Sequence, residues 1–138
     1  MIRPFRADLH IHTVLSACAE VEMIPPLIVD QAQSLGLGMI AVTDHNTGEN
    51  AAAVMEAARG GSLKVLPGME LQTREEVHLL CLFDTLDQSA AWQEEVFHAL
   101  PPLLNREDIF GPQWVVDAGG DLRRTETRLL AVSADISL

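Results

Sequence analysis

Several residue types are scarce in this 138-residue sequence, which contains no tyrosine, two cysteines and a single lysine. Cys18 and Cys81 do not form a Cys-x-x-Cys pair, so the sequence predicts neither a disulfide framework nor a zinc cluster built from thiolates. Acidic residues outnumber basic ones by 20 to 9, which gives a formal charge of −11. This charge disfavours binding to nucleic acid through its phosphates, because that affinity comes from lysine and arginine.

Long apolar runs are also missing. No run approaches the ~20 residues that a membrane helix needs, and residues 1–6 lack the apolar stretch and cleavage site of a signal peptide. We therefore expect a cytoplasmic protein without membrane contact. With 48% hydrophobic residues, a chain of this length buries roughly two thirds of its unfolded surface, enough for one domain over residues 1–138.

Predicted strands and helices alternate along most of the chain. Strands are expected at residues 7–13, 37–43, 63–66 and 77–83, and helices at residues 25–36, 46–59 and 87–100. Pro25 and Pro26 fit the start of the first helix, and Asn46 with Glu49 fits an N-terminal cap of the second. Residues 37–43 are almost entirely apolar, as expected for a strand covered on both faces in a parallel sheet. The alternation predicts an α/β fold, a TIM-like (β/α) barrel.

The pattern weakens after Leu104. Residues 114–116 and 129–132 predict a hairpin around a turn at residues 118–121. Because a (β/α) barrel takes about 250 residues, we expect only the front half of one, incomplete at the C-terminus, with core motifs at 6–83 and a less regular segment at 105–138. An open half-barrel leaves a sheet edge unpaired, which predicts self-association through that edge.

The histidines form the most informative pattern. Four of the five stand where an apolar run ends or becomes polar: His10, His12, His45 and His78. Side chains at positions i and i+2 of a strand point to the same face, so His10 and His12 can bind one cation together. Leu9 and Ile11 then face the opposite way, into a core.

Glu70 is a carboxylate just past another apolar run, between His45 and His78 in the sequence. This position predicts that it shares a metal site with the four histidines. His98 differs from them, because it lies in the last turn of the predicted 87–100 helix, where the helix dipole favours a cation. We expect His98 to be structural or at the surface.

Four short motifs, at residues 8–13, 43–46, 67–70 and 76–80, follow one another in a fixed order. In order and spacing they resemble the first motifs of the polymerase and histidinol phosphatase (PHP) family. The resemblance covers residues 6–83 and implies a distorted seven-stranded β/α barrel. It also implies two or three divalent metal ions, zinc, manganese or iron, and hydrolysis of a phosphate ester by a metal-activated water.

Ligand roles follow from the same resemblance. It implies that His10 and His12 bind the first ion, that Glu70 is the catalytic carboxylate bridging two ions, that His78 binds the second ion, and that His45 binds the third.

Three further residues complete the predicted site. Asp44, counted with Glu70 among the catalytic residues, is expected to orient a neighbouring ligand by hydrogen bonding. Cys18 stands where some family members place a further histidine, and its thiolate would favour zinc over manganese. The alternative is that Cys18 is an inert loop cysteine. Arg74, in the polar loop after Glu70, is a candidate for binding a substrate phosphate.

The predicted function is that of a metal-dependent phosphoesterase acting on a small phosphorylated molecule. Family members carry later ligands, including an Asp-x-His, whereas no histidine follows His98. An amidohydrolase-type metallohydrolase is one alternative because it also opens with His-x-His. That class often bridges its metals with a modified lysine, and Lys64 lies inside the third predicted strand. The other alternative is a non-catalytic metal-binding or interaction domain, if the later ligands do not exist.

Overall fold

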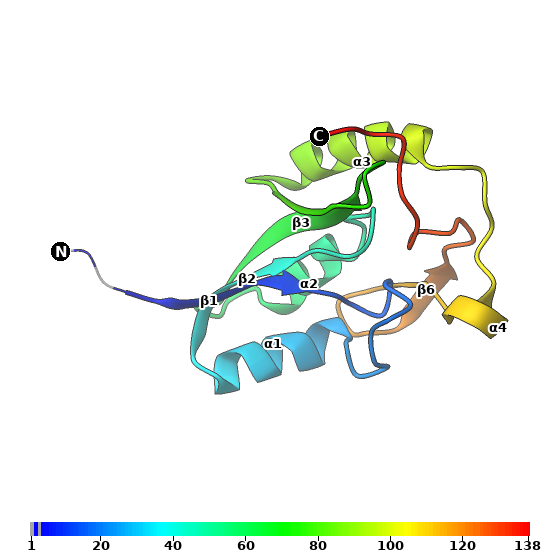
Figure 1. Cartoon of the computed structure of the whole chain (residues 1–138). Helices are drawn as coiled ribbons and strands as arrows, with labels where there is room; N and C mark the ends of the chain where they lie inside the picture. The colour runs from blue at the N-terminus through cyan, green and yellow to red at the C-terminus, as the bar shows by residue number, and fades with distance from the viewer. Residues whose placement is uncertain (1, 3) are drawn as a thin grey trace.

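The computed structural model describes residue 2 and residues 4–138, and its centre is a four-stranded sheet. The strands lie side by side in the order β1 (Arg6–Ile11), β2 (Leu37–Val42), β3 (Lys64–Gln72) and β4 (His78–Leu82). The first three are parallel, whereas β4 is antiparallel to β3. The sheet curls but stays open, with β1 at one edge and β4 at the other (Figure 1). The predicted α/β half-barrel is confirmed.

The second half of β2 is completely buried. Its residues Ile40, Ala41 and Val42 have no exposed surface, because β2 has a strand on each side. Successive side chains of a strand point to opposite faces, so Ile40 and Val42 share one core. This burial on both faces is what the continuous apolar run at residues 37–43 predicts.

Three helices cover the sheet: α1 (Pro25–Ser34), α2 (Ala51–Ala57) and α3 (Leu86–Ala99). One core contains residues of α1, α2 and β2, and a second contains residues of α3 and β3. Figure 1 shows α1 and α3 on opposite sides of the sheet. Pro25 lies in the first turn of α1, where its missing N–H costs no hydrogen bond. Thr85 and Gln88 form a capping box that begins α3.

The antiparallel direction of β4 departs from the parallel strands that a (β/α) barrel implies. No helix separates β3 from β4; residues 73–77 form a tight turn in which Glu76 has a positive φ of 60°. The turn pairs Gln72 with His78, so the first residue of β4 lies beside the last residue of β3. As a result, His78 lies at the start of its strand rather than after the end of a parallel one.

The predicted cap at Asn46 is wrong. Helix α2 begins at Ala51 with Asn50 before it, and Asn46 has a left-handed φ of 52° instead. The Asn46 Nδ2 donates to the carbonyl oxygens of Leu130 and Val132, each at 2.7 Å. Asn46 therefore connects the loop after β2 to the C-terminal segment, a contact between residues that lie far apart in the sequence.

The C-terminal region contains the short helix α4 (Glu107–Phe110) and a two-stranded sheet of β5 (Trp114–Val116) and β6 (Leu122–Thr125). The predicted hairpin therefore has the expected first strand, but its second strand is β6 and not residues 129–132. Residues 129–132 contain the buried Leu129 and Leu130, and their apolar character reflects core packing rather than strand pairing. None of the helices in the described part of the chain is long and apolar enough to cross a membrane.

Both edges of the sheet are exposed. Five of the six residues of β1 are exposed, and in β4 Leu80 and Leu82 are 42% and 39% exposed. Ile11 packs against the core formed with α1 and α2, as predicted. Leu9 does not face a core, because it is 37% exposed at the open edge.

Candidate metal centre

The four histidines of the predicted site gather at one end of the sheet, where β1, β2 and β3 finish and β4 begins. His10 lies near the end of β1 and His12 follows it, while His45 follows β2 and His78 begins β4. An antiparallel strand begins at the end of the sheet where its neighbouring strands finish. The reversed direction of β4 therefore brings His78 to the other three histidines.

Glu70 lies at the same end of the sheet, near the end of β3. Its neighbours Met69 and Leu71 are buried in the core that contains α3, so strand alternation turns the Glu70 carboxylate to the opposite face. The backbone of Glu70 continues the pairing beyond the end of β2. Its N–H donates to the carbonyl oxygen of Asp44 at 3.0 Å, and its carbonyl oxygen accepts from the Asn46 N–H at 3.0 Å. These bonds hold the carboxylate at the end of β2.

The Glu70 carboxylate contacts all four histidines. Its Oε2 lies 2.8 Å from the Nε2 of His12, 3.2 Å from the Nε2 of His10 and 3.3 Å from the Nδ1 of His45. Its Oε1 lies 2.9 Å from the Nδ1 of His78. One acidic side chain is therefore the common neighbour of four imidazoles.

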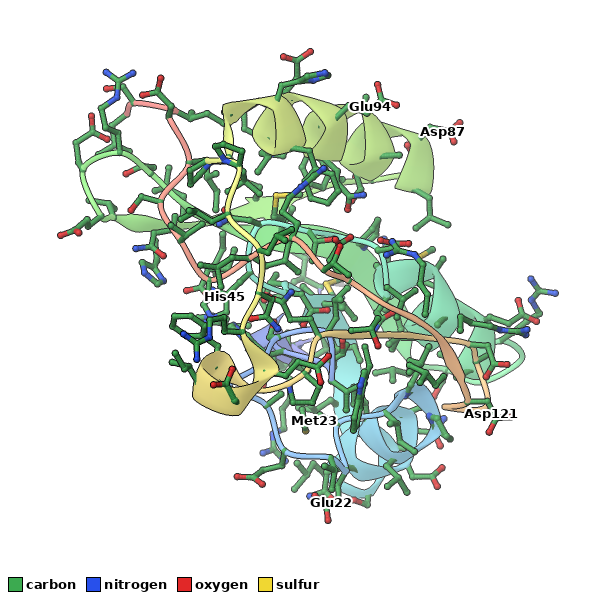
Figure 2. The ribbon with its side chains drawn as sticks, turned by 90° about the vertical axis from the view of Figure 1, so that its right-hand side faces the viewer. Glu22, Met23, His45, Asp87, Glu94 and Asp121 are labelled. Atoms are coloured by element: carbon green, nitrogen blue, oxygen red, sulfur yellow. The ribbon has the colours of Figure 1, made fainter. Side chains whose placement is uncertain are left out.

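The carboxylate of this group is buried, whereas two of its histidines are open to solvent. The Glu70 side chain is 6% exposed, whereas those of His10 and His78 are 48% and 45% exposed. His45 lies between α3 and α1 in Figure 2, where the labelled Asp87 and Glu94 project outward from α3. A ligand from solvent would reach the group past His10 and His78.

Burial and the neighbouring imidazoles shift the pKa values of Glu70 and His45. Desolvation alone would raise the pKa of Glu70, but hydrogen bonds with His78 and His10 outweigh it and hold the pKa below its usual value. Burial, with the neighbouring His12, lowers the pKa of His45 to about 4. Near neutral pH the centre thus offers an ionised carboxylate and a neutral His45 imidazole, which are the forms that bind metal ions.

Cys18 lies close to the ring nitrogens of His12 and His45 that do not face Glu70. Its Sγ is 3.4 Å from the Nδ1 of His12 and 3.6 Å from the Nε2 of His45. Desolvation raises the pKa of the Cys18 thiol. The loop after β1 therefore brings a sulfur to the histidines, as the sequence position of Cys18 suggested.

The donor atoms fit divalent metal ions. Three groups each bring three ligand atoms within 4.8 Å of one another: His10 with His12 and Glu70, His45 with Glu70 and His78, and His12 with Cys18 and His45. Two nitrogens bound to one tetrahedral zinc lie ~3.3 Å apart, and the Nε2 atoms of His10 and His12 lie 3.1 Å apart. Imidazole and carboxylate suit zinc, manganese and iron, and the sulfur adds a preference for softer ions.

Asp44 is fully buried and hydrogen-bonds to the segment that follows the candidate ligand His12. Its carboxylate accepts hydrogen bonds from the Thr13 N–H at 2.7 Å, the Thr13 Oγ1 at 2.8 Å and the Ser16 Oγ at 2.7 Å. Burial raises the pKa of Asp44, and the bonds from Ser16 and Thr13 oppose the rise. The Ser16 Oγ also accepts from the His45 N–H at 3.1 Å. Asp44 thus connects the segment after His12 with the segment that carries His45.

Three supporting residues were not identified from the sequence: Thr13, Ser16 and Asn50. Asn50 is fully buried, and its Nδ2 donates to the Thr13 Oγ1 at 2.9 Å and to the Trp114 carbonyl oxygen at 3.0 Å. Its Oδ1 accepts from the Val116 N–H at 3.1 Å. A polar residue before an alanine-rich helix resembles an ordinary cap, so the sequence held no signal for these distant partners.

Arg74 and His98 lie apart from the donor groups. Arg74 is in the turn between β3 and β4, where its Nε and Nη2 lie 2.7 and 2.6 Å from Asp135 Oδ1. Phosphate binding by Arg74 stays a prediction, and a phosphate would have to compete with this ion pair. The exposed His98 hydrogen-bonds through Nδ1 to the Glu94 carbonyl oxygen at 2.8 Å, in agreement with the predicted surface position.

Comparison with known proteins identifies the family. A family model described as the PHP domain matches residues 8–118. The chain belongs to the PHP domain family. Two curated relatives, the 5'-3' exoribonucleases Rnm of Salmonella typhimurium and Escherichia coli, are 35% and 36% identical to this PHP domain over 80 and 81 residues. The matched stretches cover 54% of this chain and 26% of each relative, so the chain spans about a quarter of their length.

Solved structures share the fold. A candidate metal-dependent phosphoesterase from Bifidobacterium adolescentis is 30% identical, with a TM-score of 0.51 over 70% of this chain and 35% of that one. An amidohydrolase from Chromobacterium violaceum is 24% identical, with a TM-score of 0.53 over 68% of this chain and 34% of that one. A lesion-specific endonuclease from Pyrococcus furiosus is 23% identical, with a TM-score of 0.58 over 69% and 26%. The last two likenesses concern the fold alone.

Proposed function

We propose that this PHP domain carries the metal site of a hydrolase that cleaves phosphate esters. The observation that supports the proposal most strongly is the contact of one buried carboxylate, Glu70, with four imidazoles. Membership of the PHP family and the likeness to a candidate metal-dependent phosphoesterase at 30% identity point the same way.

In this proposal, His10, His12 and Glu70 would hold one divalent ion, and His78 with Glu70 would hold a second. Divalent ions bound side by side supply positive charge for the phosphate and lower the pKa of the attacking water. Glu70 keeps the two positions together because its two oxygens face different histidines. Neutral imidazoles position the ions without cancelling their charge, which leaves that charge available to the substrate.

We place the substrate on the side where His10 and His78 are exposed. Glu70 closes the opposite side, so a phosphate group would approach past these two rings. The labelled acids Glu22, Asp87 and Asp121 lie at the periphery in Figure 2. A small phosphorylated molecule fits a chain of charge −11 better than a long polyanion does.

RNA is the second candidate substrate. It is favoured by one observation, that two relatives at 35% and 36% identity are 5'-3' exoribonucleases. The amidohydrolase alternative has less support, because Lys64 is exposed at the beginning of β3 while Glu70 lies near the end of that strand. A modified Lys64 could not replace Glu70 as a bridge.

Glu70→Gln tests the proposal. The amide keeps the size of the side chain but removes the negative charge that two ions would share. We expect hydrolysis of a phosphomonoester or phosphodiester, assayed with manganese or zinc, to fall by more than about 100-fold, since loss of an outer-shell partner already costs about 10- to 100-fold. Metal analysis should show fewer bound ions per chain.

The matched control is Glu94→Gln, which makes the same change on the outer surface of α3 (Figure 2). It should retain both hydrolysis and bound metal. Equal turnover in the two variants would contradict the bridging role of Glu70. A protein that binds metal but cleaves neither small phosphoesters nor RNA would support the non-catalytic alternative.

A further inference from the structure

Asn46 extends the pairing between β2 and β3 with its side chain. The backbone part of this pairing ends at Asn46, whose N–H donates to the Glu70 carbonyl oxygen at 3.0 Å. The chain then turns away from β3 with a left-handed φ of 52°. Residues two apart in a strand bond to the same neighbour, and the next such amide of β3, that of Gln72, donates to Asn46 Oδ1 at 3.0 Å. A side-chain oxygen thus takes the place of a backbone carbonyl.

The same amide group also binds the C-terminal segment. Its Nδ2 donates to the carbonyl oxygens of Leu130 and Val132, each at 2.7 Å. The Ala134 N–H in turn donates to the Gln72 carbonyl oxygen at 2.9 Å. Asn46 is fully buried, and both its amide oxygen and its amide nitrogen have hydrogen-bond partners. The amide is therefore held from two sides, by β3 and by the C-terminal segment.

Three candidate metal ligands lie next to this amide in the chain or across the sheet. His45 precedes Asn46, and Glu70 accepts the Asn46 backbone N–H. His78 pairs with Gln72 across β3 and β4. The bond from Gln72 to Asn46 therefore fixes the strands that carry Glu70 and His78 relative to the loop that carries His45. Asparagine meets both demands of the position, because it adopts a left-handed φ more readily than most residues and its amide both donates and accepts.

We propose that Asn46 is a positioning residue of the candidate metal centre: by binding Gln72, its amide sets the spacing of the three ligand-bearing segments. Asn46 itself binds no ion in this proposal. The inference rests on the proposed metal site and specifies what holds its ligands in place. Ligands that are already held in the binding geometry bind an ion more tightly than ligands that must first be ordered. The competing explanation is that the amide stabilises the fold without affecting the ligands.

Asn46→Gly tests this role, because glycine keeps the left-handed backbone and removes only the amide. Zinc titration followed by calorimetry should show an affinity lowered about 10- to 100-fold, the usual cost of losing a partner that orients a ligand. In the metal-free protein, the Gln72 amide should exchange its hydrogen faster than in the unaltered protein.

Both measurements are independent of hydrolysis. An unaltered protein that binds zinc but cleaves no phosphoester would refute the proposed function and not this inference. An unaltered protein that binds no zinc would refute the metal site and this inference with it.

Gln113→Ala is the matched control. The buried Gln113 amide also makes three hydrogen bonds to backbone groups. Its Nε2 donates to the Glu126 and Arg128 carbonyl oxygens, and its Oε1 accepts from the Leu130 N–H. None of these three bonds reaches a segment that carries a candidate ligand, so the variant should lower the urea midpoint and keep the zinc affinity. Equal loss of zinc affinity in Gln113→Ala and Asn46→Gly, or unchanged affinity in Asn46→Gly, would show that Asn46 only stabilises the fold.

Asn46→Asp separates the two sets of bonds. Aspartate also adopts a left-handed φ and keeps an oxygen that accepts from the Gln72 N–H, but it has no NH2 group for the carbonyl oxygens of the C-terminal segment. We expect a lower urea midpoint than in the unaltered protein, a zinc affinity close to that of the unaltered protein, and a Gln72 amide that stays protected from exchange. A loss of zinc affinity of about 10-fold or more would contradict the role of the Gln72 bond, whatever the behaviour of Asn46→Gly.

Discussion

The hydrogen bonds of Thr13 show that its hydroxyl donates to Asp44. Its Oγ1 accepts from the Asn50 Nδ2 at 2.9 Å and from the Leu15 N–H at 3.2 Å, so its own hydrogen points to Asp44 Oδ2. The other oxygen of Asp44 accepts from the Thr13 N–H and the Ser16 hydroxyl. Every group that contacts the carboxylate is therefore a donor, and an ionised Asp44 satisfies all of them.

Asp44→Asn should consequently destabilise the protein, although it changes few atoms. Whichever way the new amide is turned, its NH2 group meets a donor, so we expect the free energy of unfolding to fall by about 1–3 kcal/mol. Urea unfolding measures this change, and metal titration should show weaker binding because the segments carrying His12 and His45 shift. Asp30→Asn, on the exposed surface of α1, is the control. Equal stability of the two variants would show that Asp44 does not hold these segments.

At the scale of elements, the β5–β6 hairpin is connected to the candidate metal centre through Asn50. The three hydrogen bonds of its side chain link the start of α2 to β5 and to the loop that follows β1. Thr13 and Val116 are buried, so the loss of the Asn50 side chain would leave polar groups of these residues without a partner. A hairpin that lies outside the four PHP motifs therefore supports the ligand loop.

Removal of this link should loosen two distant segments together. Asn50→Ala leaves the Val116 N–H and the Trp114 carbonyl oxygen without their side-chain partner, at a cost of about 1–3 kcal/mol in the free energy of unfolding. We expect faster amide hydrogen exchange in residues 114–125 and 13–16 than elsewhere. The exposed Gln31→Ala variant should exchange like the unaltered protein. A uniform increase over the whole chain would contradict a local link.

At the scale of the whole molecule, no strand among the described residues pairs with the outer side of β1. Its outer side chains are exposed, and a groove of about 650 Å³ separates it from α1, lined by apolar residues that include Ile11, Leu27 and Leu35. An exposed strand edge next to apolar surface is a template for pairing with another chain. We propose that the isolated 138-residue chain associates with itself through β1.

Leu9→Lys tests this association. A lysine on an edge strand opposes strand pairing, so light scattering should give a mass above that of one chain for the unaltered protein and the monomer mass for the variant. Val21→Lys makes the same change at a residue that is 64% exposed outside the sheet, and it should not alter the mass. A monomeric unaltered chain at high concentration would refute the proposal.

Much of the fold and most of the candidate ligands could be predicted from local patterns. The i, i+2 spacing places His10 and His12 on one face of a strand whatever surrounds them, and the apolar run at residues 37–43 requires burial on both faces. The order of the four motifs placed the chain in the PHP family. The cap at Asn46 and the pairing of residues 129–132 were predicted wrongly, because a polar residue before a helix and a short apolar run each fit more than one structure.

Only the tertiary structure decided which residues meet. The sequence by itself determined the types of the candidate ligands and the strands beside which they lie, because side-chain chemistry and strand alternation are local properties. Long-range packing decided that β4 reverses direction and brings His78 to Glu70, that Asp44 and Asn50 connect separate loops, and that β1 stays open. It also decided which nitrogen of His12 and of His45 faces Cys18. Such contacts depend on the positions of segments far apart in the chain, which no local pattern specifies.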